Sequence, residues 1–128
     1  VVRNSEIVLR RQIIFATGSE EILPPSEPVL VEVADVLLRN PELELIEIQG
    51  HTDNSGSPEV NMQLSQHRAE AVAQWLVDHG VEPGRLTAKG YGPTRPIAPN
   101  ITAYHRARNR RVQFKIVRRA DVTAAAGP

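Results

Sequence analysis

Cysteine is absent from this chain of 128 residues. Disulfide bonds, thiolate-bound metals and a cysteine nucleophile are therefore excluded. Long apolar runs are also lacking, since no stretch approaches the roughly eighteen residues that a membrane-spanning helix needs. The first residues do not show the basic-then-apolar order of a signal peptide. We therefore expect either a cytoplasmic protein or a piece of a longer one.

Lysine is scarce, and one part of the chain has no acidic residue. Thirteen of the fifteen basic residues are arginine, a side chain suited to two-pronged binding of carboxylate or phosphate. The net charge is zero, but residues 1–84 carry fourteen acids against five bases, and residues 85–120 carry ten bases and no acid. Either the basic part binds a polyanion, or the two parts interleave in the fold and neutralise each other.

Apolar periodicity predicts one domain with two main helices and four strands. The predicted strands are 6–15, 43–49, 85–92 and 110–117, and the predicted helices are 27–40 and 57–80, with a local break or second start at Ser65. One more helical turn fits between the last two strands. The order β-α-β-α-β-(α)-β indicates an α/β fold, a two-layer α/β sandwich with a mixed four-stranded sheet packed by helices. We expect the domain to span residues 1–119 and residues 120–128 to form a flexible tail.

His51 and Asp53 lie two residues apart in the sequence "GHTDNSG", directly after the second predicted strand. The carboxyl end of a central strand is the usual place for ligand sites in open α/β sheets. A catalytic zinc site would need three protein ligands, and the other histidines are not spaced to meet His51. We therefore expect no metal and no cofactor, and we predict that the His51 ring bonds a backbone group of the loop.

Arg68 lies fifteen residues after Asp53, among apolar positions of the second predicted helix. The two residues could form an internal salt bridge, or they could form a binding site in which both stay solvated at a pocket mouth. The spacing leaves both readings open. No serine elbow and no phosphate-binding glycine loop is present, so we expect no enzymatic activity. A nucleic-acid-binding domain that uses the arginine-rich last strand is the alternative function.

Three segments in order resemble a known family. They are "IQGHTDNSGSPEVNMQLSQHRAEAVAQWLVDHGV", "RLTAKGYGPTRPIAPN" and "RARNRRVQF". The sequence is similar to the OmpA-like C-terminal domain that is shared by OmpA, the peptidoglycan-associated lipoprotein Pal and the flagellar stator protein MotB. The resemblance runs from about Ile14 to Val117.

The resemblance implies non-covalent peptidoglycan binding through meso-diaminopimelate of the stem peptide. It implies that Asp53 accepts the ammonium group of diaminopimelate and that Arg68 binds its carboxylate, while His51 and Thr52 shape the loop. Other polar family positions line or brace the pocket, and here they are Thr52, Asn61, Asn109 and Arg110. The implied location is the periplasm, as part of an outer-membrane or envelope-associated protein.

The sequence departs from the family pattern at three positions. Ala16 stands in place of a frequent aspartate, Gly18 in place of a frequent asparagine, and His105 in place of the usual glycine. We expect contacts made there by the backbone to survive, and contacts made by the family's side chains to be lost.

Overall fold

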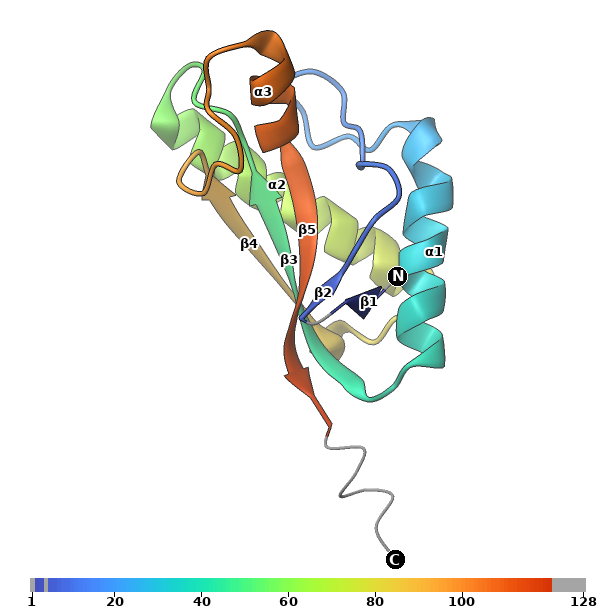
Figure 1. Cartoon of the computed structure of the whole chain (residues 1–128). Helices are drawn as coiled ribbons and strands as arrows, with labels where there is room; N and C mark the ends of the chain where they lie inside the picture. Colours follow the sequence, from blue (N-terminus) through green and yellow to red (C-terminus); the bar gives the residue numbers. More distant parts are fainter. Residues whose placement is uncertain (1, 4, 121–128) are drawn as a thin grey trace, which may run out of the picture.

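The computed structural model describes residues 2, 3 and 5–120 of the chain (Figure 1). The predicted tail, 120–128, lies outside the described residues except for Ala120. The elements, in chain order, are β1 (Val2–Arg3), β2 (Glu6–Ile7), the short 3-10 helix η1 (Pro24–Ser26), α1 (Glu27–Arg39), β3 (Leu43–His51), α2 (Pro58–Asp78), η2 (Pro83–Arg85), β4 (Leu86–Gly92), α3 (Ala103–Asn109) and β5 (Arg111–Arg119).

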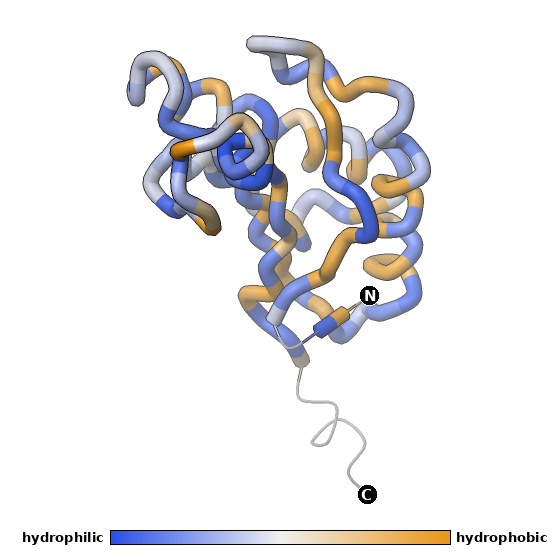
Figure 2. The backbone as a smooth tube through the Cα atoms, turned by 45° about the horizontal axis from the view of Figure 1, so that its top comes forward, coloured by the Kyte–Doolittle hydropathy of each residue, from blue (hydrophilic) through white to orange (hydrophobic). Residues whose placement is uncertain are grey.

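The predicted fold class is confirmed, with a sheet of five strands in place of four. The strand order is β1-β2-β5-β3-β4, in which β3 and β4 run parallel and the other neighbours run antiparallel. Helices α1 and α2 cover one face of this mixed sheet (Figure 1). Hydrophobic and hydrophilic positions alternate along the chain (Figure 2), and apolar side chains of α1, α2 and the sheet meet in the core. The core between the two layers contains Leu30, Leu37, Ile46, Ile48, Val72, Leu76 and Phe114.

The predicted strand 6–15 is wrong beyond Ile7. Only Glu6–Ile7 pairs with β5, and the chain then leaves the sheet. Ile13 is buried and Ile14 is exposed, which produces the alternation of a strand. However, the backbone of Ile14 bonds to Leu23 and to the Ser26 hydroxyl, so it pairs with the returning chain and not with the sheet. This change matters because residues 12–18 become a wall of the cavity described below.

Helix α2 begins as predicted, at a serine cap followed by Pro58 in the first turn. The Ser57 hydroxyl accepts a hydrogen bond from the Val60 amide at 3.4 Å. The predicted break at Ser65 is wrong, because α2 continues through it. Ser65 is fully buried, and its hydroxyl donates to the Met62 carbonyl at 2.9 Å and accepts from the Gly92 amide at 2.9 Å. The hydroxyl is therefore used to join α2 to the end of β4.

Glycines in β3 and β4 let α2 lie directly on the strand backbone. A Cβ atom on Gly50 would lie 2.9 Å from the carbonyl carbon of Ser65, and one on Gly90 would lie 2.6 Å from the Cα of Gln66. Both obstacles are helix backbone, which cannot turn aside as a side chain can. The glycines therefore fix the distance between α2 and the strand end that leads to Asp53.

The sheet face away from the helices carries a polar network that includes His51. The His51 Nε2 lies 3.1 Å from Gln49 Oε1, and the Gln49 amide donates to Glu47 at 2.6 Å. Because the Gln49 nitrogen donates to Glu47, its oxygen faces the histidine and Nε2 carries the proton. The ring stacks on Tyr91 at 5.3 Å, and the Tyr91 hydroxyl also donates to Glu47. The ring thus bonds a side chain of its own strand, and not a loop backbone group as predicted.

We predict that Gly50→Ala lowers the free energy of unfolding by about 3 kcal/mol or more, because the added methyl group overlaps the helix backbone. Urea unfolding measures the change. The matched control is Gly84→Ala, since no atom lies within 4 Å of a Cβ at that position, and its effect should be below about 0.5 kcal/mol. Equal effects of the two substitutions would contradict this packing.

We also predict that His51 makes stability depend on pH. Burial, followed by the positive charges of Arg111 and Arg95, lowers the pKa of His51 to about 4. Between the ordinary pKa of about 6.5 and this value, the unfolded chain binds a proton that the folded chain does not. The folded state should therefore lose about 2 kcal/mol as the pH falls from about 7.5 to about 5.

Urea unfolding at the two pH values measures this loss, and His51→Gln should remove most of it. His67→Gln is the control, because His67 is exposed on α2, and this variant should keep the full dependence. A dependence that persists unchanged in His51→Gln would assign the effect to another group.

Candidate functional site

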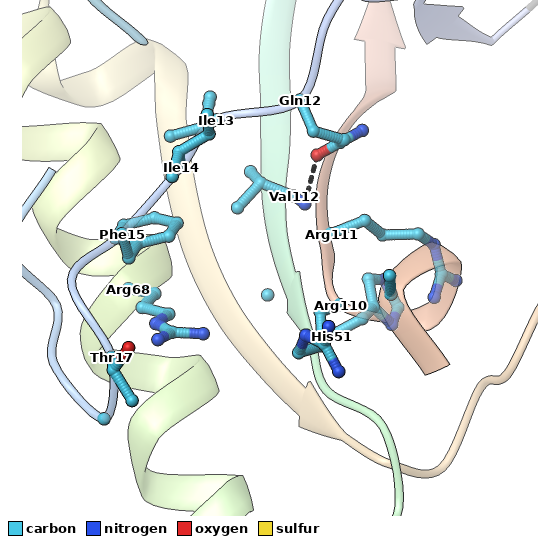
Figure 3. Close-up of a pocket in the computed structure, with 13 residues that line it drawn as sticks. Gln12, Ile13, Ile14, Phe15, Thr17, His51, Arg68, Arg110, Arg111 and Val112 are labelled. Atoms are coloured by element: carbon cyan, nitrogen blue, oxygen red, sulfur yellow. Dashed lines mark hydrogen bonds between the residues drawn. The ribbon is translucent and has the colours of Figure 1, made fainter. Parts of the chain in front are cut away.

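A cavity of about 520 Å³ opens at the carboxyl end of β3 (Figure 3). Segment 12–18 forms one wall, α2 forms another, and the junction of α3 with β5 forms the third. Its lining residues are Gln12, Ile13, Ile14, Phe15, Thr17, Gly18, Gly50, His51, Arg68, Ala107, Arg110, Arg111 and Val112. A strand end of this kind is where ligand sites in open α/β sheets form, so the predicted location is consistent with the cavity.

Arg68 reaches into the cavity from α2 and is held by neutral groups. Its Nε donates to the Ser19 carbonyl at 2.8 Å, and its Nη2 donates to the Ala16 carbonyl at 3.4 Å. The guanidinium carbon lies 4.8 Å from the centre of the Phe15 ring. Burial, and then the nearby charge of Arg110, lower the pKa of Arg68, but an arginine stays protonated. The other N–H groups of the fork remain able to bind a carboxylate.

Asp53 is buried, in contrast to the expected solvated carboxylate. Its side chain is 9% exposed, and both of its oxygens accept hydrogen bonds. Oδ1 accepts from the Ser55 amide at 2.8 Å, and Oδ2 accepts from Nη1 of Arg110. Burial alone would raise the pKa of Asp53, but the bonds from Ser55 and Arg110 outweigh it and lower the pKa. Asp53 therefore stays ionised in the folded protein.

The internal Asp53–Arg68 salt bridge, one of the two open readings, is not formed. The partner of Asp53 is Arg110, whose side chain is 48% exposed. Asp53 and Arg110 are separated by 57 residues in the chain, and they meet because β5 lies next to β3 in the sheet. Arg68 and Arg110 face the same space from opposite walls (Figure 3).

The other predicted polar residues differ in their placement. Only Arg110 lines the cavity. The Thr52 hydroxyl donates to the Asp53 carbonyl at 2.8 Å, and the Asn61 amide donates to the Ser55 carbonyl at 2.7 Å. Thr52 and Asn61 thus hold the loop that carries Asp53.

Asn109 is fully buried and braces the loop before α3. Its Oδ1 accepts from the amides of Ile97 and Ala98, and its Nδ2 donates to the Ala98 carbonyl and to Asn100. These bonds use its polar atoms, so Asn109 acts on the cavity by placing its neighbour Arg110.

Of the three departures from the family pattern, Ala16 and Gly18 lie in segment 12–18 beside the cavity, and His105 lies on α3. Ala16 meets Arg68 through its carbonyl, a contact that does not depend on its side chain. Gly18 has a φ of 65°, in the left-handed region that favours glycine, and it lines the cavity. His105 lies on α3 and does not line the cavity.

Sequence reasoning missed most of the lining residues, and two of these, Phe15 and Arg111, bear directly on the charges of the cavity. Phe15 was placed at the end of a strand, and its position beneath Arg68 depends on the return of segment 12–18. Arg111 is buried, with hydrogen bonds from its guanidinium to the carbonyls of Asn109 and Arg95. The sequence feature that could have indicated its position is the alternation of Arg111, Gln113 and Lys115, because alternate residues of β5 lie on the same face of the sheet, away from the helices.

Neither alternative chemistry gains support from the described residues 2, 3 and 5–120. No three His, Cys, Asp or Glu side chains come together there in a way that could hold a metal ion. Two basic residues of strand β5 are paired with carboxylates from the acidic part of the chain: Lys115 with Glu6 at 2.9 Å and Arg118 with Glu44 at 3.2 Å. The acidic and basic parts of the chain therefore interleave. No helix in this part of the chain is long and apolar enough to cross a membrane.

The sequence of this chain is similar to those of known proteins, including a probable lipoprotein and a peptidoglycan-binding protein. The probable lipoprotein YiaD of Escherichia coli is 39% identical over 102 residues, which are 80% of this chain and 46% of YiaD. The peptidoglycan-binding protein ArfA of Mycobacterium tuberculosis is 38% identical over 104 residues, which are 81% of this chain and 32% of ArfA. The chain thus spans half or less of the length of these relatives.

Among solved structures, the cell wall anchor of the T6SS from Pseudomonas aeruginosa has a similar fold. The TM-score is 0.73 at 35% identity, over 82% of this chain and 75% of that one. The profile of the OmpA family matches residues 14–110, a segment that includes Phe15, Asp53, Arg68 and Arg110. The chain therefore belongs to the OmpA family.

Proposed function

We propose that this chain binds peptidoglycan without a covalent bond, through the free end of meso-diaminopimelate in the stem peptide. The observation that carries the proposal is Arg68, which two backbone carbonyls hold with its remaining donors toward the cavity. The names of ArfA and of the T6SS anchor associate the family with peptidoglycan and the cell wall. Binding of this kind would anchor a larger parent protein.

The free end of diaminopimelate is a zwitterion, and we assign a partner to each charge: Arg68, which lines the cavity, and Asp53, which is not a lining residue but is bonded to the lining residue Arg110. Its carboxylate fits the planar fork of Arg68, because a guanidinium presents two parallel donors to two oxygens. Its ammonium group fits Asp53, which stays ionised because Ser55 and Arg110 donate to it. Each charge-assisted hydrogen bond in such a setting contributes roughly 1.5–3 kcal/mol.

We infer a binding role and not catalysis. A general base must be free to take a proton at neutral pH. Both oxygens of Asp53 accept hydrogen bonds. The Nε2 of His51 donates to Gln49, and its Nδ1 has no hydrogen-bond partner, but burial lowers the pKa of His51 to about 4, well below the value that suits a general base at neutral pH. Since peptidoglycan lies outside the cytoplasm, the proposed location is the periplasm, as part of an envelope-associated or outer-membrane protein. This replaces the cytoplasmic option of the sequence analysis.

We predict that the chain is retained by sacculi with diaminopimelate in the stem peptide and much less by sacculi with lysine. Lysine supplies an ammonium group but no second carboxylate, so Arg68 would lose its partner. The difference in dissociation constant should be about tenfold or more. Co-sedimentation with the two kinds of purified sacculi measures it. Equal retention would count against the role of Arg68.

A second prediction separates binding from stability at Arg68. Arg68→Ala should weaken muropeptide binding about thirtyfold or more, because the ligand carboxylate loses its charged partner. The free energy of unfolding should change by only about 1 kcal/mol, because the contacts of Arg68 are two carbonyls and the Phe15 ring, and none of them is a charge that its loss would leave unpaired. Arg68→Lys should recover part of the affinity, since an ammonium cannot form the two-pronged contact.

Calorimetric titration and urea unfolding supply the two measurements. Arg39→Ala is the matched control, because it removes an arginine charge from the exposed end of α1, where its partner is Asp35. This control should bind as the unchanged chain does. If Arg68→Ala unfolds early yet binds normally while folded, Arg68 is a structural residue.

A further inference from the structure

The charges around the cavity do not balance for a ligand that is a simple zwitterion. Three arginines line it, Arg68, Arg110 and Arg111, and no acidic residue is among its lining residues. Arg68 bonds only to backbone carbonyls, and Arg111 bonds to two carbonyls and to the Gln113 amide oxygen. Among these three, Arg110 is paired with a carboxylate, Asp53. Arg68 and Arg111 therefore have no carboxylate hydrogen-bonded to them, and the nearest acidic groups that act on them, Glu20 and Glu6, do so only at longer range.

Arg110 also occupies the position that the proposed function assigns to the ligand. Oδ2 of Asp53 accepts from Arg110, and Oδ1 accepts from the Ser55 amide. An incoming ammonium group thus meets a carboxylate that already has a cation. Of the two partners, Asp53 is buried and Arg110 is about half exposed, so Arg110 is the one that can leave. The guanidinium and the ammonium compete for one oxygen.

We propose that Arg110 holds the ammonium position on Asp53 in the free protein, and that it moves to a second carboxylate of the ligand when the stem peptide binds. The inference rests on the proposed function and adds a rule of selectivity to it. Arg110 and Arg68 line the same cavity, and the charge of Arg110 acts after burial to lower the pKa of Arg68. A ligand carboxylate between them removes this repulsion.

The chemistry of the stem peptide fits this rule when its main-chain carboxylates are free. A stem of alanine, γ-linked glutamate and terminal diaminopimelate carries the zwitterionic end and two further carboxylates. Conversion of those two groups to carboxamides removes both charges and leaves the zwitterion unchanged. The site should therefore prefer the unamidated stem, since amides offer no charge to the displaced Arg110.

The test uses two synthetic peptides and calorimetric titration. The first is N-acetyl-L-alanyl-γ-D-glutamyl-meso-diaminopimelate, and the second is the same peptide with both main-chain carboxylates as carboxamides. Acetylation leaves the diaminopimelate end as the one ammonium group. We expect the unchanged chain to bind the diamide about tenfold or more weakly than the free acid.

The variant Arg110→Gln distinguishes displacement of Arg110 from Asp53 from a simple attraction between Arg110 and the ligand carboxylates. This variant frees Asp53 from its competitor, so it should bind the diamide several-fold more tightly than the unchanged chain does. It should also bind the two peptides within about threefold of each other. Arg108→Gln is the matched control, since Arg108 is an exposed α3 arginine that does not line the cavity, and it should keep the full preference.

The outcomes separate this inference from the proposed function. If the unchanged chain binds both peptides equally, or if Arg110→Gln weakens binding of both alike, the exchange is wrong and diaminopimelate binding stands. If neither peptide binds, the proposed function fails and the inference fails with it. A thermal melt of each variant verifies that it is folded at the temperature of the titration.

Discussion

The direct contact of α2 with the backbone of β3 and β4 is the constraint on which the site depends. At Gly50 and Gly90 the helix lies where a Cβ atom would otherwise stand. Ser65, at the same level of the helix, bonds the end of β4 through its hydroxyl. Arg68 follows Ser65 by less than one turn, so the contact that fixes the helix also fixes the arginine. The loop with Asp53 leaves β3 from the same point.

Around that contact, side chains outside the cavity lining set the geometry of the loops that carry Asp53 and Arg110. Asn61 and Thr52 hold the loop of Asp53, and Asn109 holds the loop before Arg110. Their hydrogen bonds replace regular secondary structure where the backbone is irregular, which keeps buried polar groups satisfied. The accuracy of a site on loops comes from such bonds, because loops alone are mobile.

Helices with a regular spacing of apolar residues could be predicted from the sequence. Segments whose structure depends on hydrogen bonds to residues far away in the chain could not. Helices 27–40 and 57–80 have apolar spacing and end signals, and both were placed within two residues. Segment 6–15 has the alternation of a strand, yet its last half pairs with residues 22–26, a choice that depends on η1 and the Ser26 hydroxyl. Spacing singled out Asp53 and Arg68 as a possible pair, and the family resemblance supplied their proposed ligand roles, which remain a prediction. The pairing of Asp53 with Arg110 needed the strand order, which no local pattern contains.

A buried carboxylate at a ligand site must have a partner before the ligand arrives. Asp53 is 9% exposed on its side chain, and an ionised group at that depth is strongly unfavourable when it is unpaired. The free protein therefore needs an internal cation, and Arg110 supplies it. In the binding that we propose, the ligand exchanges one ion pair of Asp53 for another, so only the difference between the two pairs contributes to affinity. On this proposal, selectivity depends as much on what the ligand offers the displaced arginine as on what it offers Asp53.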